Sequence, residues 1–112
     1  MNTDTQGSDF IAERWWDYHV SPSEKIPVRV AFTRFTRPAQ GTRGKLWEAR
    51  FLIFWPDGNI IERTAFGPDS ADALILLVEL FRIECEKLKA KMGEKITLDS
   101  GGSLFGYDFS AK

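Results

Sequence analysis

The stretch that decides the fold spans residues 45–92 and reads KLWEARFLIFWPDGNIIERTAFGPDSADALILLVELFRIECEKLKAKM. It holds two strand patterns joined by Trp55-Pro56-Asp57-Gly58-Asn59, and then a long helical pattern. Proline, aspartate and glycine in this order are typical of a type I turn followed by a left-handed glycine, which is a common hairpin connection. The stretch therefore predicts an antiparallel hairpin followed directly by a helix.

The two strands of the hairpin are predicted at residues 45–55 and 59–66 from their alternating apolar side chains. The second half of the first strand is apolar on both faces, so we expect this strand inside a sheet. The helix that follows has signals at both ends. Asp69 or Ser70 is placed to cap its N-terminus, Asp72 suits the positive end of the helix dipole, and Gly93 is placed to end it.

The predicted helix is apolar over a wider arc than one sheet covers. It has roughly 22 residues and a length of ~33 Å, and its first three turns are apolar over roughly 220°. One stripe has the spacing of a helix packed on a sheet: Leu74, Leu77, Val78, Phe81, Cys85, Leu88 and Met92. A second stripe lies beside it: Ala73, Leu76, Leu80 and Ile83.

Two interpretations of the second stripe stay open. In the first, the C-terminal segment around Leu104, Phe105 and Phe109 folds back over it. In the second, the stripe is the interface of a homodimer, because an exposed apolar patch of this kind usually marks an interface.

Segments on both sides of this stretch complete the predicted fold. Residues 10–20 and 26–36 alternate between apolar and polar positions and are predicted strands, whereas residues 96–98 and 104–109 are short strand candidates. We predict an α+β fold, in which an antiparallel meander of about four strands is covered on one face by the long helix and followed by a short C-terminal strand or hairpin. Residues 1–9 are expected to form a disordered tail before a single domain at residues 10–112. The expected core residues are Trp47, Phe51, Ile53, Leu74, Leu77, Val78, Phe81 and Leu88.

Composition argues against several classes of protein. The chain has 112 residues, 43% of them hydrophobic, and one cysteine, Cys85, so it can build one core and has no intramolecular disulfide. Its N-terminus lacks the basic and then apolar order of a signal peptide, and no apolar run reaches the roughly 20 residues that cross a bilayer. We expect a cytoplasmic protein without membrane contact.

Charge is segregated along the chain, although the net charge is only −1. Residues 25–50 carry seven basic side chains and one acidic one, whereas the remainder carries 8 basic and 15 acidic side chains. A basic strand-and-loop surface of this kind suits phosphates or an acidic protein, but charge also protects edge strands against aggregation. The candidate partner-binding residues are Arg29, Arg34, Arg37, Arg43 and Lys45.

No catalytic, metal-binding or cofactor motif is visible. His19 is the only histidine and is expected on the surface at a strand end, while Cys85 on the inner helix stripe is expected to be inert packing. Gly101-Gly102-Ser103 does not stand between a strand and a helix N-terminus, as a phosphate-binding loop requires. We therefore expect no catalytic residue, no metal ligand and no cofactor.

Several short motifs stand in a fixed order along the chain. They are Ile11-Ala12-Glu13-Arg14, Val28-Arg29-Val30, Trp47 to Phe51, Trp55-Pro56-Asp57-Gly58, Gly67-Pro68-Asp69-Ser70-Ala71-Asp72-Ala73-Leu74 and Gly101-Gly102-Ser103-Leu104-Phe105-Gly106-Tyr107. In this order they resemble a family of small bacterial proteins of unknown function. The motifs are structural, so the resemblance implies no functional residue.

These observations favour a non-enzymatic protein that binds another protein and forms a homodimer. Immunity proteins and secretion chaperones are of similar size and class, an analogy that fold alone does not turn into function. The alternative is a nucleic-acid-binding protein that uses the basic surface between Arg29 and Lys45, although a pI of about 5.8 is low for that class. An enzyme is the least favoured class, because no catalytic constellation is visible.

Overall fold

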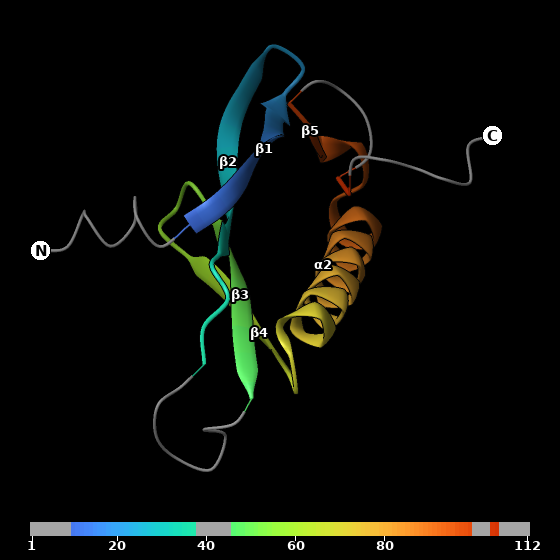
Figure 1. Cartoon of the computed structure of the whole chain (residues 1–112). Helices are drawn as coiled ribbons and strands as arrows, with labels where there is room; N and C mark the ends of the chain where they lie inside the picture. Colours follow the sequence, from blue (N-terminus) through green and yellow to red (C-terminus); the bar gives the residue numbers. More distant parts are fainter. Residues whose placement is uncertain (1–9, 38–45, 100–103, 106–112) are drawn as a thin grey trace, which may run out of the picture.

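The computed structural model describes residues 10–37, 46–99 and 104–105 (Figure 1). It confirms the α+β fold: an antiparallel sheet with one long helix packed against it and a short C-terminal strand. The predicted tail at residues 1–9, and all but the first residue of the loop predicted at residues 37–44, lie outside the described residues. In chain order the elements are β1 (Phe10–Ser21), β2 (Glu24–Thr33), β3 (Trp47–Phe54), β4 (Ile60–Gly67), α2 (Ser70–Met92), η1 (Gly93–Lys95) and β5 (Ile96–Leu98).

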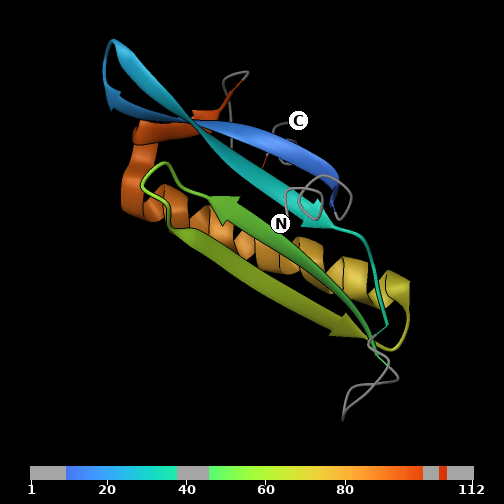
Figure 2. The same cartoon turned by 90° about the vertical axis from the view of Figure 1, so that its left-hand side faces the viewer.

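The sheet has the order β4-β3-β2-β1-β5 within the described part of the chain. Its first four strands form the predicted meander, and β5 joins the far edge by pairing antiparallel with β1. Helix α2 covers one face of the sheet. Figure 2 shows the face away from α2, which we call the open face, turned toward the viewer with α2 behind it. The molecule therefore has two layers, and β4 forms one border of the sheet.

The β3–β4 hairpin forms as its turn residues predict. Gly58 has a φ of 98°, and its N–H donates to the Trp55 carbonyl at 3.0 Å. The Asn59 N–H is bound by the Asp57 carboxylate at 2.9 Å, which fixes the turn further. Strand β3 lies between β2 and β4, as its two apolar faces predicted.

Helix α2 begins and ends at the predicted signals. Asp69, rather than Ser70, is the N-cap, and its carboxylate accepts the Asp72 N–H at 2.7 Å. Gly93 ends the helix with a φ of 61°, a conformation that residues with a side chain rarely adopt. The helix has 23 residues, so the estimate from the sequence was close.

Phe81 lies at the centre of the core between sheet and helix. Its ring centroid is 5.1 Å from that of Phe32, 5.2 Å from that of Phe51 and 6.0 Å from that of Trp16. These rings belong to β2, β3 and β1, so one helix side chain contacts three strands. The other buried apolar residues of this core are Val28, Val30, Ala49, Ile53, Ala65, Leu77, Cys85, Leu88, Ile96 and Leu104.

The prediction of which helix face is buried was wrong in part. Compared with the orientation expected from the sequence, α2 is rotated about its own axis. Leu74 and Val78 were expected in the core but are 46% and 45% exposed, whereas Ala73 is fully buried. The cause is a close approach between β4 and the helix start: a Cβ added at Gly67 would lie 2.5 Å from the Ala73 backbone nitrogen. Small residues on both sides let the two elements meet, and this contact turns the Leu74 row outward. Trp47, also expected in the core, is only half-buried.

Irregularities in β2 and at the start of β1 shift the pairing of these strands. The alternation of apolar residues in the sequence does not show where they occur. Strand β2 ends at Thr33, not Thr36, because Thr33, Arg34 and Phe35 stand opposite only Ala49 and Arg50 before the Thr36–Glu48 bridge. At the start of β1 an irregularity between Phe10 and Ala12 breaks the alternation. It places Phe10 on the open face of the sheet, where its ring lies 6.3 Å from that of Phe54.

Side chains of β1 form hydrogen bonds with the backbone of Leu104 and Phe105. The Trp16 Nε1–H donates to the Leu104 carbonyl at 3.0 Å, and the Arg14 guanidinium donates to the carbonyls of both Leu104 and Phe105. Leu104 is 3% exposed, and the Phe105 ring lies 5.9 Å from Phe81. This explains why Arg14 stands on the apolar face of its strand: it satisfies carbonyls that the sheet does not pair.

Replacing Phe81 by alanine tests how much this side chain contributes to the stability of the protein. We expect Phe81→Ala to lower the free energy of unfolding by about 3–5 kcal/mol, because the ring leaves a cavity bordered by three strands. Chemical denaturation followed by tryptophan fluorescence measures the change, with Lys89→Ala on the exposed helix surface as the control. A loss no greater than that of the control would show that Phe81 does not organise the core.

Candidate functional site

Arg29, one of the predicted basic residues, lies on the open face of the sheet. The Arg29 side chain forms an ion pair with Glu13 on β1 at 2.9 Å. Its guanidinium also lies 5.1 Å from the ring centroid of Phe10 and 5.5 Å from that of Phe54. Arg29 therefore joins three strands across the open face, through a charge pair and two cation–π contacts.

The other predicted basic residues do not gather around Arg29. Arg34 is exposed at the β2 bulge, where it lines a hollow of about 130 Å³. Arg37 is exposed, and its guanidinium lies 5.9 Å from the Trp47 ring. Arg43 and Lys45 lie outside the described residues.

Carboxylates from neighbouring strands balance the positive charge on the open face. Arg50 pairs with Glu62 on β4 at 2.8 Å, and Lys25 pairs with Asp17 on β1 at 3.4 Å. The acidic partners come from segments outside residues 25–50, so a count of charge along the sequence misses them. The described part of the open face is thus a mixed ionic and aromatic surface.

The second predicted surface, the helix stripe, is only partly accessible. Leu76 and Ile83 are 41% and 40% exposed, whereas Ala73 is buried against β4 and Leu80 is half-buried against the core. Leu74 and Val78, which the sequence assigned to the core, are exposed together with Ile75. We call these exposed residues the apolar helix surface: Leu74, Ile75, Leu76, Val78 and Ile83.

The apolar helix surface has two flanks on opposite sides of the helix. Leu74 and Val78 belong to the same row as Phe81, which faces Phe105. Leu76 and Ile83 belong to the row that faces β4, in line with Glu84, whose carboxylate pairs with Arg63 of β4 at 3.3 Å. The second flank therefore lies along the β4 border of the molecule.

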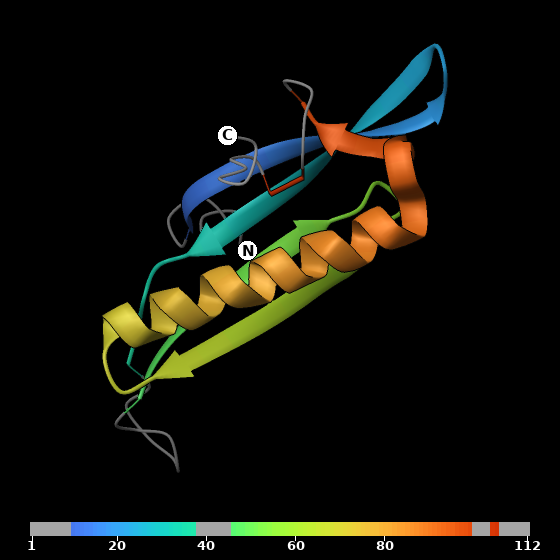
Figure 3. The same ribbon diagram turned by 90° about the vertical axis from the view of Figure 1, so that its right-hand side faces the viewer.

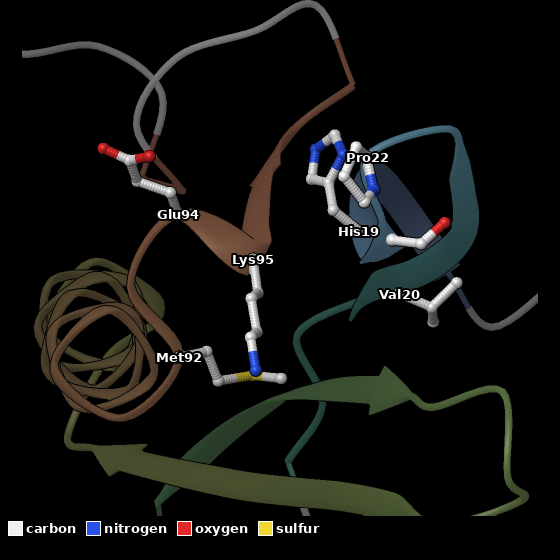
Figure 4. A pocket seen from close by; sticks show the side chains of 7 residues that line it. His19, Val20, Pro22, Met92, Glu94 and Lys95 are labelled. Atoms are coloured by element: carbon white, nitrogen blue, oxygen red, sulfur yellow. The ribbon is translucent and has the colours of Figure 1, made fainter.

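A hollow of about 630 Å³ lies where the β1–β2 hairpin faces the end of α2 (Figure 4). His19, Pro22, Met92 and Lys95 line it, and Figure 4 shows the Glu94 carboxylate pointing away from His19. The His19 ring shares a hydrogen bond with the Thr97 hydroxyl at 3.0 Å.

Two buried side chains of α2, Cys85 and Glu84, are held by packing or by ion pairs. Burial raises the pKa of the Cys85 thiol to about 12, so the thiol stays protonated and unreactive at neutral pH. Glu84 is 5% exposed, and its carboxylate is paired with Arg63 at 3.3 Å and with Lys87 at 3.8 Å. Across the described ranges, no three histidine, cysteine, aspartate or glutamate side chains gather in a way that could hold a metal ion.

Sequence comparison assigns the chain to a family. Residues 12–109 match the domain of unknown function DUF6968. The chain belongs to this family. No curated protein and no solved structure is significantly similar to the DUF6968 chain. Among its described helices, none has both the length and the apolar character needed to cross a membrane.

The environment of Cys85 gives a direct test of helix packing in this DUF6968 protein. At about pH 8 we expect iodoacetamide to label the native protein only slowly, because burial suppresses both thiolate formation and access. In denaturant the same thiol should react within minutes, as measured by intact mass. Equally fast labelling of the native protein would contradict the packing of α2 on the sheet.

Proposed function

We propose that this DUF6968 protein is a non-enzymatic protein-binding protein that associates with a second copy through the apolar helix surface. The observation that carries the proposal is the exposure of five large apolar side chains on one helix, between 40% and 66%. Scattered single apolar residues are normal on protein surfaces, but several large ones exposed along one helix, here on two flanks, favour an interface.

The polar side of α2 supports this assignment. Arg82 forms ion pairs with Glu79 and Glu86, so the outermost ridge of the helix is charged from its middle onward. The apolar residues flank this ridge instead of being randomly mixed with it. Each apolar flank therefore borders charged residues, just as the apolar centre of a protein–protein interface borders a polar rim.

The open face of the sheet is available for a different protein partner. Its ion pairs and the Arg29 stack give it charges of both signs, which suits a protein with complementary charges. Binding of a partner protein in the manner of an immunity protein or a chaperone would fit this surface. A nucleic-acid partner has less support, because the described arginines Arg29 and Arg50 are already paired with carboxylates. Binding of single-stranded DNA that weakens steeply with salt would favour it.

Light scattering over a dilution series tests self-association. We expect the parent protein to be a dimer, and Leu76→Glu and Ile83→Glu each to convert it into a folded monomer, because a buried charge opposes the interface. Ser23→Glu is the control, since it adds the same charge in the exposed β1–β2 turn. Circular dichroism shows that the variants are folded.

A parent protein that is monomeric at every concentration would overturn the self-association part of the proposal. A dimer that survives every substitution on the apolar helix surface would move the interface elsewhere and remove the observation that carries the proposal.

A further inference from the structure

Strand β4 is the border strand of the sheet in the described part of the chain. It has eight residues, contains no proline, and pairs through its whole length with β3 on one side. Among the described residues no strand pairs with it on the other side. The opposite border of the sheet is the three-residue strand β5. A long regular edge strand is a template for pairing with another chain, and natural proteins usually cover or interrupt it.

The apolar helix surface continues this border into the second layer. Figure 3 shows α2 running along β3 and β4, with β4 at the outside. Leu76 and Ile83 lie on the β4 side of the helix, beside the Arg63–Glu84 ion pair that joins strand to helix. The border strand of the sheet and an apolar helix flank thus lie one above the other along the same side of the molecule.

The geometry points to a two-fold dimer in which β4 pairs antiparallel with β4 of a second copy, while the Leu76 and Ile83 flanks of the two α2 helices pack together. This inference rests on the proposed function and names the surface and the partner for it. It joins two sheets into one continuous sheet with both helices on the same face.

Standard packing distances allow both contacts at once. Strands in a sheet are about 4.8 Å apart, so a helix above the boundary between β3 and β4 lies about 5 Å from a two-fold axis placed beyond β4. The two helix axes are then about 10 Å apart, which is within the range of packed helices, about 8–10 Å. Pairing the strands therefore brings the helices to contact distance without a change in the fold.

The helix flank is complementary to itself in this arrangement. If the axis passes between Glu79 and Leu80, the antiparallel partner helix places its Ile83 opposite Leu76. The same register places Lys87 of one copy opposite Asp72 of the other, and both of these side chains are exposed. One register thus pairs apolar with apolar and acid with base, twice each, as a two-fold interface requires.

The position of α2 above β4 indicates that the two-fold axis passes near the middle of β4 as well. Gly67 lies beside Ala73, and Arg63 reaches Glu84, so the helix midpoint between Glu79 and Leu80 lies above the neighbourhood of Thr64. Thr64 is also near the middle of β4. A single two-fold axis can therefore serve both layers.

The two layers together also provide an adequate interface. A stable dimer buries about 800 Å² on each partner, which is more than a few helix side chains supply. The eight-residue edge of β4 adds backbone hydrogen bonds and the side chains of a whole strand. The combined border is consistent with a specific dimer, whereas either layer alone is small.

Disulfide trapping tests the strand pairing. We expect Thr64→Cys to form a cross-linked dimer under mild oxidation, because side chains directly opposite in antiparallel strands have Cβ atoms about 4.5–5.5 Å apart. Thr97→Cys, on the opposite border of the sheet, is the matched control and should stay monomeric on a reducing-agent-free gel. The native Cys85 is buried and does not take part.

A charge exchange tests the helix register. Asp72→Lys and Lys87→Glu should each raise the dimer dissociation constant by about 3-fold to 30-fold, since two ion pairs become repulsive. The double variant Asp72→Lys with Lys87→Glu should recover most of the parent affinity. Equal losses in the single and double variants would contradict the register.

The outcomes separate this inference from the proposed function. A dimer that Leu74→Glu or Val78→Glu dissociates, with no Thr64→Cys cross-link, would keep the apolar helix surface as an interface and overturn the β4 pairing. A parent protein that is monomeric throughout would overturn both. Cross-linking at Thr64 together with rescue in the double variant supports the two-fold dimer.

Discussion

The packing of Phe81 against three strands is the interaction on which the structure depends. This ring contacts Trp16, Phe32 and Phe51, and it also meets Phe105 of the C-terminal segment. Because it sits in the middle of α2, it fixes where the helix lies on the sheet. The close contact at Gly67 then fixes the rotation of the helix. Position and rotation together decide which apolar residues are buried and which are left on the surface.

The functional proposal follows from that rotation. Turning Ala73 and Glu84 toward β4 leaves Leu76 and Ile83 along the border of the molecule and Leu74 and Val78 along the other flank. The cost is an apolar surface in contact with water, which monomeric proteins rarely keep. The open sheet face has a different character, since Arg29 and Arg50 are paired with carboxylates across strands. The proposed self-association and the proposed partner binding therefore use different surfaces of the molecule.

Local signals in the sequence predicted much of the fold. The Asp57-Gly58 turn, the Asp69 cap and the Gly93 end act within a few residues, and all three appear where expected. The rotation of α2 and the position of Leu104 depend instead on contacts between distant segments, such as that of Trp16 with Leu104. The periodicity of a sequence cannot show such contacts. For the same reason the sequence did not show that Arg29 and Arg50 are paired with carboxylates, because Glu13 and Glu62 come from other parts of the chain.

Hydrogen–deuterium exchange at high and low protein concentration tests the central claim most directly. If two copies join along β4 and α2, amides of β4 that do not bond to β3 should exchange more slowly in the concentrated sample, as should peptides covering Leu76 to Ile83. The β1–β2 turn and β5 should exchange equally in both samples. Exchange in β4 that does not change with concentration, in a protein shown to be dimeric, would contradict pairing along this border.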